Sequence, residues 1–394
     1  MRRTLAVFLM SLALGCGKDK ACRVDNGDGT TTDRCTSGTR ELVCTNPDCS
    51  GITSLIIQDT DLTSVNLAKL ATIDTLRIET NSALTSVSLP LLTAANSLAL
   101  MYSPALGSAS IPALTVATSG VVVFDCPALT SLSLVALTTG RVQISGTALT
   151  NVNLAALTSA GGLVIKDNPA LTSASLLVLT ESTNGLTILA NPSLTTLSLP
   201  VLTKVGYTLE VSNNSALTEL SMPSLTSLGA PLYIMDNAVL GSVNVPVLNS
   251  AGQLAIERNM GLAHVDLPAL TDVVGWVIIR GNAALTSLSL PALTDVGRYL
   301  LIEGNSAMTS LDLPVLATVS GTPQADPLTG LFIKDNTALS GVNMPALTTV
   351  NNELTITGNP DYPQCAAEAI LAQLMPAPTY VDISGNDATA TCPP

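Results

Sequence analysis

The chain has 394 residues, of which 11% are charged and 47% are hydrophobic, and its formal net charge at pH 7 is −13. This acidic balance argues against nucleic acid as a partner, because binding it requires clustered Lys and Arg that neutralise phosphates. With so few charged residues, most of the surface has to consist of Ser, Thr, Asn and Gly.

The first 15 residues have the layout of a secretory signal. An Arg-Arg pair precedes an apolar run from Leu5 to Leu14, which is too short to span a bilayer permanently. The stretch Leu12-Ala13-Leu14-Gly15-Cys16 resembles a bacterial lipobox, which implies that residues 1–15 are removed and Cys16 is lipidated. We therefore expect an anchored lipoprotein of the cell envelope, in the outer membrane or at the cell surface. The same small residues also suit ordinary signal cleavage, which would give a secreted protein.

Residues 16–50 contain a cluster of cysteines, which is typical of an oxidising compartment. Cys22, Cys35, Cys44 and Cys49 allow three pairings, and we favour Cys22–Cys35 with Cys44–Cys49 as the disulfides of a cap. Zinc is a competing interpretation, but paired Cys-x-x-Cys knuckles are missing. Between the first two cysteines, residues 25–30 contain Asn-Gly and Asp-Gly, which favour a hairpin over a weak calcium loop.

Residues 51–359 repeat one unit, apolar-x-apolar-x-x-Asn-x-x-Leu-x-x-Leu-x-Leu-Pro-x-Leu-Thr-x-Val-Gly, as from Val277 to Gly297. Its alternation predicts short strands, and a period of about 22 to 23 residues signals stacked repeats. A unit this short buries its apolar face only by stacking, so we expect a parallel β-coil of about fourteen turns and about 65 Å. The predicted strands begin at Leu55, Leu76, Leu98, Val121, Val142, Leu163, Leu186, Leu209, Leu232, Leu254, Val277, Leu300, Leu331 and Leu354.

Two positions of the unit have mechanical explanations. An Asn at each inner corner can bond backbone groups of neighbouring turns that would otherwise be buried unpaired. Cys126 and Thr147 fall in this Asn column when the repeats are aligned, so Cys126 is interpreted as a buried structural thiol and not as a nucleophile. The Pro that follows many Leu-x-Leu pairs ends a strand where the loss of its N–H costs least.

These Leu-x-Ile-x-x-Asn and Leu-Pro-x-Leu-Thr-x-Val-Gly units resemble receptor L domains, the leucine-rich right-handed β-helices of growth-factor receptor ectodomains and fungal wall proteins. The resemblance covers roughly three quarters of the chain. It implies an all-β, right-handed parallel β-helix, and a role in binding proteins or building walls. It supplies no ligand-binding motif that can be transferred residue by residue.

Two segments depart from the repeat. The turn between Asn305 and Asn336 is longer than the others, so residues 322–329 should form a loop beside a coil face. In the C-terminal segment, residues 360–394, the run from Gln364 to Leu374 is rich in helix formers and is followed by a strand-like stretch, residues 380–384. We expect this helix and strand to cap the coil, tied by a Cys365–Cys392 disulfide.

One face of the coil is predicted to carry pairs of exposed Ser, such as Ser287 and Ser289. The simplest interpretation is a solvated sheet face. Regular hydroxyl arrays on flat coils can also bind ordered water or ice, but charged residues interrupt this one. The only His, His264, falls in this array without an evident catalytic or metal partner.

The face formed by the strands before the Asn column carries the aromatic and charged residues that depart from the Ser and Thr pattern. Trp276 and Tyr299 occupy equivalent positions in adjacent turns and should stack. Exposed apolar patches with aromatic residues often mark binding surfaces, although the C-terminal cap or the loop at 322–329 could cover this one. The candidate ligand-binding residues are Tyr233, Met235, Trp276, Ile278, Arg280, Tyr299, Leu301, Glu303, Phe332 and Lys334.

Beside the aromatic residues, Glu257, Arg280, Glu303 and Lys334 should form a ladder of alternating charge. A polysaccharide lyase on a β-helix would instead need acidic and basic groups converging in a cleft, so an enzyme is a remote alternative. We predict no cofactor and no metal. The prediction is a surface-anchored module that recognises an unidentified protein or glycan, with a rigid envelope spacer as the alternative.

Overall fold

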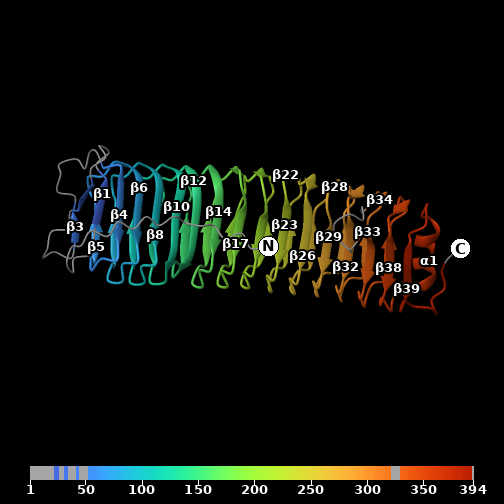
Figure 1. The fold of residues 1–394 in the computed structure, drawn as a ribbon. Helices are drawn as coiled ribbons and strands as arrows, with labels where there is room; N and C mark the ends of the chain where they lie inside the picture. Colours follow the sequence, from blue (N-terminus) through green and yellow to red (C-terminus); the bar gives the residue numbers. More distant parts are fainter. Residues whose placement is uncertain (1–21, 26–30, 34–40, 44–51, 321–328, 393–394) are drawn as a thin grey trace.

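The computed structural model describes residues 22–25, 31–33, 41–43, 52–320 and 329–392. The chain forms a rod of stacked turns that runs from one end of the molecule to the other (Figure 1). Parallel pairing of one strand per turn continues from residue 54 to residue 384. The all-β parallel solenoid of about fourteen turns predicted from the repeat is therefore confirmed.

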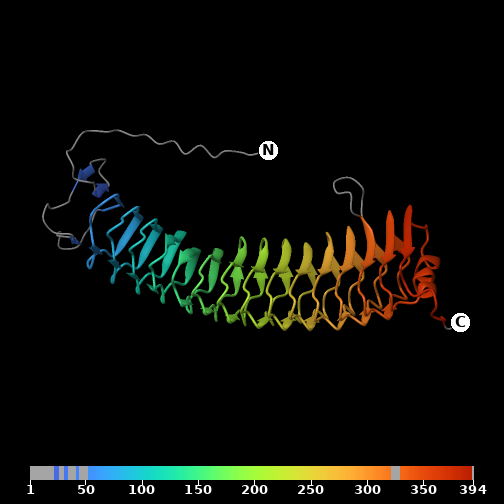
Figure 2. The same cartoon turned by 90° about the horizontal axis from the view of Figure 1, so that it is seen from below.

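Each turn contributes one strand to each of two opposite faces. Figure 2 shows the rod bowed, with one set of strands along its concave side and a set of shorter strands along its convex side. We call these the inner and outer strands. The inner strands are β4 (Ser54–Gln58), β6 (Thr72–Glu79), β8 (Ala94–Met101), β10 (Val116–Cys126), β12 (Thr139–Thr147), β14 (Ser159–Lys166), β17 (Leu186–Leu189), β20 (Leu209–Ser212), β23 (Pro231–Met235), β26 (Gln253–Glu257), β29 (Val277–Arg280), β32 (Tyr299–Glu303), β35 (Gly330–Lys334), β38 (Glu353–Thr357) and β39 (Tyr380–Ser384).

The outer strands are three residues long and carry the Ser-rich face. They are β3 (Glu41–Val43), β5 (Ser64–Asn66), β7 (Ser86–Ser88), β9 (Ser108–Ser110), β11 (Ser131–Ser133), β13 (Asn151–Asn153), β15 (Ser173–Ser175), β18 (Thr196–Ser198), β21 (Glu219–Ser221), β24 (Ser242–Asn244), β27 (His264–Asp266), β30 (Ser287–Ser289), β33 (Ser310–Asp312) and β36 (Gly341–Asn343).

In later turns a two-residue strand precedes each inner strand, whereas in β6 to β14 the same segment is part of the inner strand itself. These short strands are β16 (Glu181–Ser182), β19 (Lys204–Val205), β22 (Ser227–Leu228), β25 (Ser250–Ala251), β28 (Asp272–Val273), β31 (Asp295–Val296), β34 (Thr318–Val319) and β37 (Thr349–Val350).

The core is a single apolar column between the two faces. In the turn that starts at Val277, the side chains of Ile279, Leu285, Leu290 and Leu293 are fully buried. Each buried Leu or Ile contributes about 1.5–3 kcal/mol relative to exposure. Because every turn repeats this set, the core extends the whole length of the rod, and no single turn could close it alone.

The predicted Asn column forms a continuous hydrogen-bonded ladder at one corner of the rod. Asn282 is fully buried. Its Nδ2 donates to the carbonyl of Ile256 in the preceding turn at 2.8 Å, and its Oδ1 accepts from the backbone N–H of Asn259 at 3.1 Å. Nδ2 also donates to the Oδ1 of Asn305 in the following turn at 3.3 Å. Each Asn therefore satisfies backbone groups of the turn before it and bonds the side chain of the turn after it.

Thr occupies this column where the corner is one residue shorter. Thr147 donates through Oγ1 to the Oδ1 of Asn168, and that Oγ1 also accepts from the N–H of Leu149 at 3.4 Å. In Asn turns the equivalent N–H instead donates to the backbone carbonyl of the Asn itself, as Leu171 does to Asn168. A hydroxyl therefore replaces a carbonyl in this corner, which confirms the predicted place of Thr147 in the ladder.

The repeat also contains a strained position that the sequence analysis did not identify. The residue immediately before the Asn column has a positive φ in every turn from 59 to 385, with values such as 55° at Ala190 and 65° at Gly281. Gly, Asn and Asp reach this conformation most readily, and most turns use one of them. Thr80, Tyr102, Ala190 and Arg258 adopt it without that advantage.

A second ladder, made by Thr, runs along the corner after the Pro. Thr294 donates through Oγ1 to the carbonyl of Thr271 in the preceding turn at 2.9 Å, and the backbone N–H of Thr294 donates to the same carbonyl. Comparable bonds link Thr115 to Thr93 and Thr203 to Thr180. In most units this Thr therefore bonds its turn to the turn before it.

The outer sheet is interrupted, whereas the inner sheet is continuous. The outer strands form three sheets, which separate between β11 and β13 and between β27 and β30. Between β18 and β21 the pairing is reduced to Ser198 with Ser221. Hydrogen-bonded strands keep a spacing of about 4.7–4.9 Å, so a bowed rod cannot stretch its convex face uniformly. The outer sheet is accordingly broken, while the inner sheet stays continuous.

The two ends of the rod are closed differently. At the N-terminal end β1 (Cys22–Asp25) pairs antiparallel with β2 (Thr31–Asp33) and with β4, which confirms the two arms of the predicted hairpin. The hairpin turn, the lipidation site Cys16 and the cysteines at 35, 44 and 49 lie outside the described residues, so the N-terminal disulfides and the signal stay predictions.

At the C-terminal end the helix α1 (Gln364–Ala372) buries Ala367 and Ile370 against the core, and β39 adds a last inner strand. Cys365 and Cys392 form the expected disulfide, with their Cα atoms 6.1 Å apart. Gln364 also ends the Asn ladder: its Nε2 donates to the carbonyl of Ile383 at 3.1 Å, and its Oε1 accepts from Asn386 at 3.4 Å.

Candidate functional site

Four aromatic side chains form a row on the concave face, and we call Tyr233, Trp276, Tyr299 and Phe332 the aromatic row. Trp276 stacks on Tyr299 with ring centroids 6.1 Å apart and planes at 18°, as the sequence predicted. On its other side Trp276 stacks on Tyr233 at 6.0 Å and 23°. Tyr299 meets Phe332 edge-on at 6.4 Å. The row is therefore continuous over the inner strands β23 to β35.

The four rings of the aromatic row differ in exposure. Tyr299 is 6% exposed and Phe332 is 5% exposed, whereas Tyr233 and Trp276 are half-buried. The sequence left open whether this zone is covered, and Tyr299 and Phe332 are buried in the described structure. Rings stacked against neighbours along the rod lose much of their accessible area to each other. Residues 321–328 of the long turn lie outside the described residues.

The orientation of the rings limits what they can recognise. Trp276 stacks on both Tyr233 and Tyr299 and is half-buried, so neighbouring rings occupy its faces. A sugar ring that binds by stacking needs a free aromatic face. The row instead offers ring edges and flanking apolar side chains, which suit packing against another protein surface.

The remaining apolar candidates extend this surface. Ile278 and Leu301 are adjacent members of one column that ends at Phe332, and both are half-buried. Met235 lies in the next column, beside Glu257, and is also half-buried. The structure thus brings the apolar candidates together on one face of five successive turns.

The predicted charge ladder forms in part. Arg280 pairs with Glu303 at 3.1 Å, and Lys334 approaches the same carboxylate at 3.9 Å. Glu257 pairs at 3.0 Å with Arg258, which also binds Asp236 at 2.8 Å. The Glu257–Arg280 step of the expected ladder is therefore replaced by a side branch. Exposed ion pairs contribute about 0–1 kcal/mol each, so these groups frame the surface more than they stabilise it.

The electrostatics of this surface are mild. Burial, followed by the charges of Glu210 and Glu257, raises the pKa of the Tyr233 hydroxyl. The Tyr233 hydroxyl donates a hydrogen bond to the Oε1 of Gln253 at 3.4 Å. Tyr233 therefore stays protonated at neutral pH and contributes a hydroxyl to the edge of the aromatic row.

The residues weighed for chemistry elsewhere occupy structural places. Cys126 is buried and unpaired, and burial raises the pKa of its thiol, so it fits a structural thiol in the Asn column. His264 is exposed on the outer strand β27. Within the described part of the chain, no three His, Cys, Asp or Glu side chains lie close enough together to hold a metal ion.

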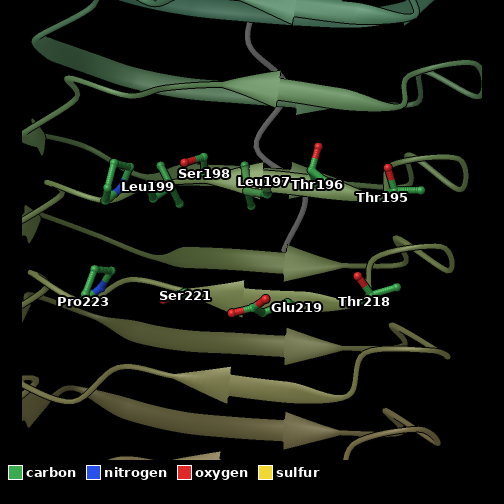
Figure 3. Close-up of a pocket in the computed structure, with 10 residues that line it drawn as sticks. Thr195, Thr196, Leu197, Ser198, Leu199, Thr218, Glu219, Ser221 and Pro223 are labelled. Carbon is green, nitrogen blue, oxygen red and sulfur yellow. The ribbon is translucent and has the colours of Figure 1, made fainter.

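A feature of the convex face was not found from the sequence. A shallow depression of about 280 Å³ lies between the outer strands β18 and β21 (Figure 3). The sequence gives only a weak indication of this depression, which is that Thr196 and Glu219 occupy positions that are Ser in most other turns. The lining residues are Thr195, Thr196, Leu197, Ser198, Leu199, Pro200, Thr218, Glu219, Ser221 and Pro223.

Comparison with known proteins identifies no family for this chain. No protein-family model matches the chain, and no curated protein matches it. Among solved structures, the chain is similar to a leucine-rich cell surface protein from Faecalibacterium prausnitzii A2-165, with 11% identity over 84% of this chain and 95% of that one, at a TM-score of 0.28. Among the described residues, no helix is long and apolar enough to cross a membrane.

Proposed function

We propose that the protein is a non-enzymatic recognition module of the cell envelope, anchored through lipid on Cys16, that binds a partner protein along its concave face. The observation that carries this proposal is the concentration of the aromatic row and its apolar flank, Ile278 and Leu301, on one stretch of the inner sheet. Elongated solenoids commonly bind through their concave surfaces. Half-buried aromatic and aliphatic groups with a charged frame match the anatomy of a protein interface.

A protein partner fits this surface better than a glycan. Both faces of Trp276 are occupied by neighbouring rings, so the central ring of the row lacks the free face that a stacked sugar would need. The half-buried ring and the flat apolar column beside it match another apolar surface. The concave shape of the rod favours a partner that is convex or narrow enough to lie along it (Figure 2).

A rigid spacer remains the second candidate function. Its support is the burial of Tyr299 and Phe332, together with the ladders of Asn and Thr, which stabilise the whole rod and are not confined to the concave face. A spacer needs only a stiff, soluble rod, and the aromatic row would then serve only to stabilise the packing of neighbouring turns.

The test is binding of soluble protein, residues 17–394, to isolated cell envelopes. The variants Ile278→Glu and Leu301→Glu place charge on the concave face, while Ser287→Glu and Ser310→Glu place the same charge on the outer strands of the same two turns. We expect the first pair to weaken saturable binding by at least about tenfold, because a buried unpaired charge in an interface costs more than 1.4 kcal/mol. The second pair should leave it unchanged.

Pretreatment of the envelopes separates the partner classes. Protease digestion should abolish binding, whereas periodate oxidation of glycans should not. Equal loss from both pairs of variants would contradict the concave face as the site. Absence of saturable binding in the unmodified protein would favour the spacer.

A further inference from the structure

We propose that the depression between the outer strands β18 and β21 is a binding site for a single neutral sugar residue, separate from the concave face. The site exists because the outer sheet opens there. The next outer strands pair at three positions, as β15 does with β18 and β21 does with β24. Between β18 and β21 only Ser198 and Ser221 pair.

The opening leaves backbone groups free to bind a ligand. In neighbouring turns the corner is closed by a bond from Thr195 N–H to the Thr172 carbonyl at 3.0 Å, and from Gly241 N–H to the Thr218 carbonyl at 2.8 Å. The corresponding bond from Thr218 N–H to the Thr195 carbonyl does not occur among the described residues. Both residues line the depression. Donors and acceptors that other turns use internally are therefore available here together.

The side chains add polar and apolar groups in a fixed arrangement. Hydroxyl groups of Thr196 and Ser198 and the carboxylate of Glu219 line one part of the depression, while Pro200 and Pro223 line the end of the two strands. The floor includes Leu197, which is 7% exposed. Hydroxyls and a carboxylate can hydrogen-bond the hydroxyl groups of a pyranose, and apolar CH groups can pack against its CH face.

The chemistry of the lining selects against other ligands. A cation would prefer oxygen ligands alone, but Thr218, whose N–H lacks the corner bond of other turns, adds a donor to this lining. An anion would meet the Glu219 carboxylate, in a chain whose net charge is −13. The volume of about 280 Å³ is at the lower limit of ligand clefts. A small neutral molecule that both donates and accepts hydrogen bonds fits these conditions.

The test is saturation-transfer NMR on the intact soluble protein with glucose, galactose, mannose and N-acetylglucosamine as probes. At least one sugar should give a saturable signal with a dissociation constant in the millimolar range. Glu219→Ala should weaken that binding by about tenfold, and Thr196→Val should weaken it without changing fold. Ser242→Ala, at the position paired with Glu219 in the closed neighbouring turn, should have no effect.

Two results would overturn the proposal. One is the absence of a saturable signal from all four sugars, and the other is equal binding by the Glu219→Ala and unmodified proteins. Hydrogen–deuterium exchange gives an independent check, because amides at 218–219 should exchange faster than those at 241–242. Equal protection of the two segments would show that the strands are closed and would also overturn it. Since Ile278→Glu lies on the opposite face, sugar binding should survive in that variant.

Discussion

Removing one Asn from the middle of the ladder should cost far more stability than an ordinary polar substitution. In Asn282→Ala, the carbonyl of Ile256 and the backbone N–H of Asn259 lose the bonds of 2.8 and 3.1 Å that they make with Asn282. Both residues are fully buried. The Ile256 carbonyl keeps its bond to β29 in the strand ladder, whereas the Asn259 N–H is left without a partner. A buried polar group left without a partner costs about 1–3 kcal/mol, so we predict a loss of about 1–3 kcal/mol in the free energy of unfolding.

The assay is chemical denaturation together with hydrogen exchange of the amides of residues 254–282. The matched control is Asn244→Ala on the outer face, where the Asn side chain makes no hydrogen bond within the described residues, and its cost should stay below about 0.5 kcal/mol. Exchange in the Asn282→Ala variant should be faster at residue 259 than in distant turns. A loss below about 1 kcal/mol, or unchanged exchange at residue 259, would refute the role given to the ladder.

Three further predictions concern single positions. Cys126→Asn should stabilise the protein by about 1–2 kcal/mol, because the amide would make hydrogen bonds in place of the weak contact of 3.8 Å from Sγ to the Leu100 carbonyl. In chemical denaturation, the Cys126→Asn variant should be more stable than the Cys126→Ser variant, and the reverse order would contradict the ladder model. Ala190→Gly should stabilise by about 0.5–1 kcal/mol, since Ala190 has φ 55°, while Gly281→Ala should change the melting temperature in the opposite direction. Burial raises the pKa of Tyr362 to about 12, whereas its pKa in the unfolded chain is about 10. Between pH 10 and pH 12 the unfolded state therefore loses a proton that the folded state keeps, so the free energy of unfolding should fall by about 2–3 kcal/mol. Tyr362→Phe should abolish that loss in urea titrations from pH 9 to 12; an unchanged loss would assign it to other groups.

The sequence was sufficient to predict the parts of the fold that are governed by period. The positions of the inner strands and the Asn column follow from residues that recur at a fixed spacing, although β6 to β14 begin before their predicted starts. The C-terminal helix follows from its run of helix formers. The Thr ladder has an equally regular signal, the Leu-Thr pair in most units, and was missed because its bond is to the backbone of another turn. The positive φ before each Asn is indicated by Gly, Asn or Asp in most turns, but exceptions such as Ala190 and Thr80 hide the pattern.

Other features depend on how the turns add up and have no local signal. Ser-x-Ser occurs in outer strands on intact and on open interfaces alike, so the local sequence does not mark the openings of the convex face. The stacking of Trp276 on Tyr299 was predictable from their equivalent positions. The burial of Tyr299 and Phe332 was not, because alternation assigns a side chain to a face without fixing how much neighbouring rings cover it.

The central claim is that a partner lies on the concave face, and the only Trp of the chain allows it to be measured directly. Trp276 is half-buried between Tyr233 and Tyr299, so its fluorescence reports on this surface alone. We would measure acrylamide quenching of Trp276 in the soluble protein, free and bound to cell envelopes. Recognition through the concave face predicts that quenching falls when the protein is bound. Unchanged quenching in protein that is demonstrably bound would place the partner elsewhere and contradict the claim.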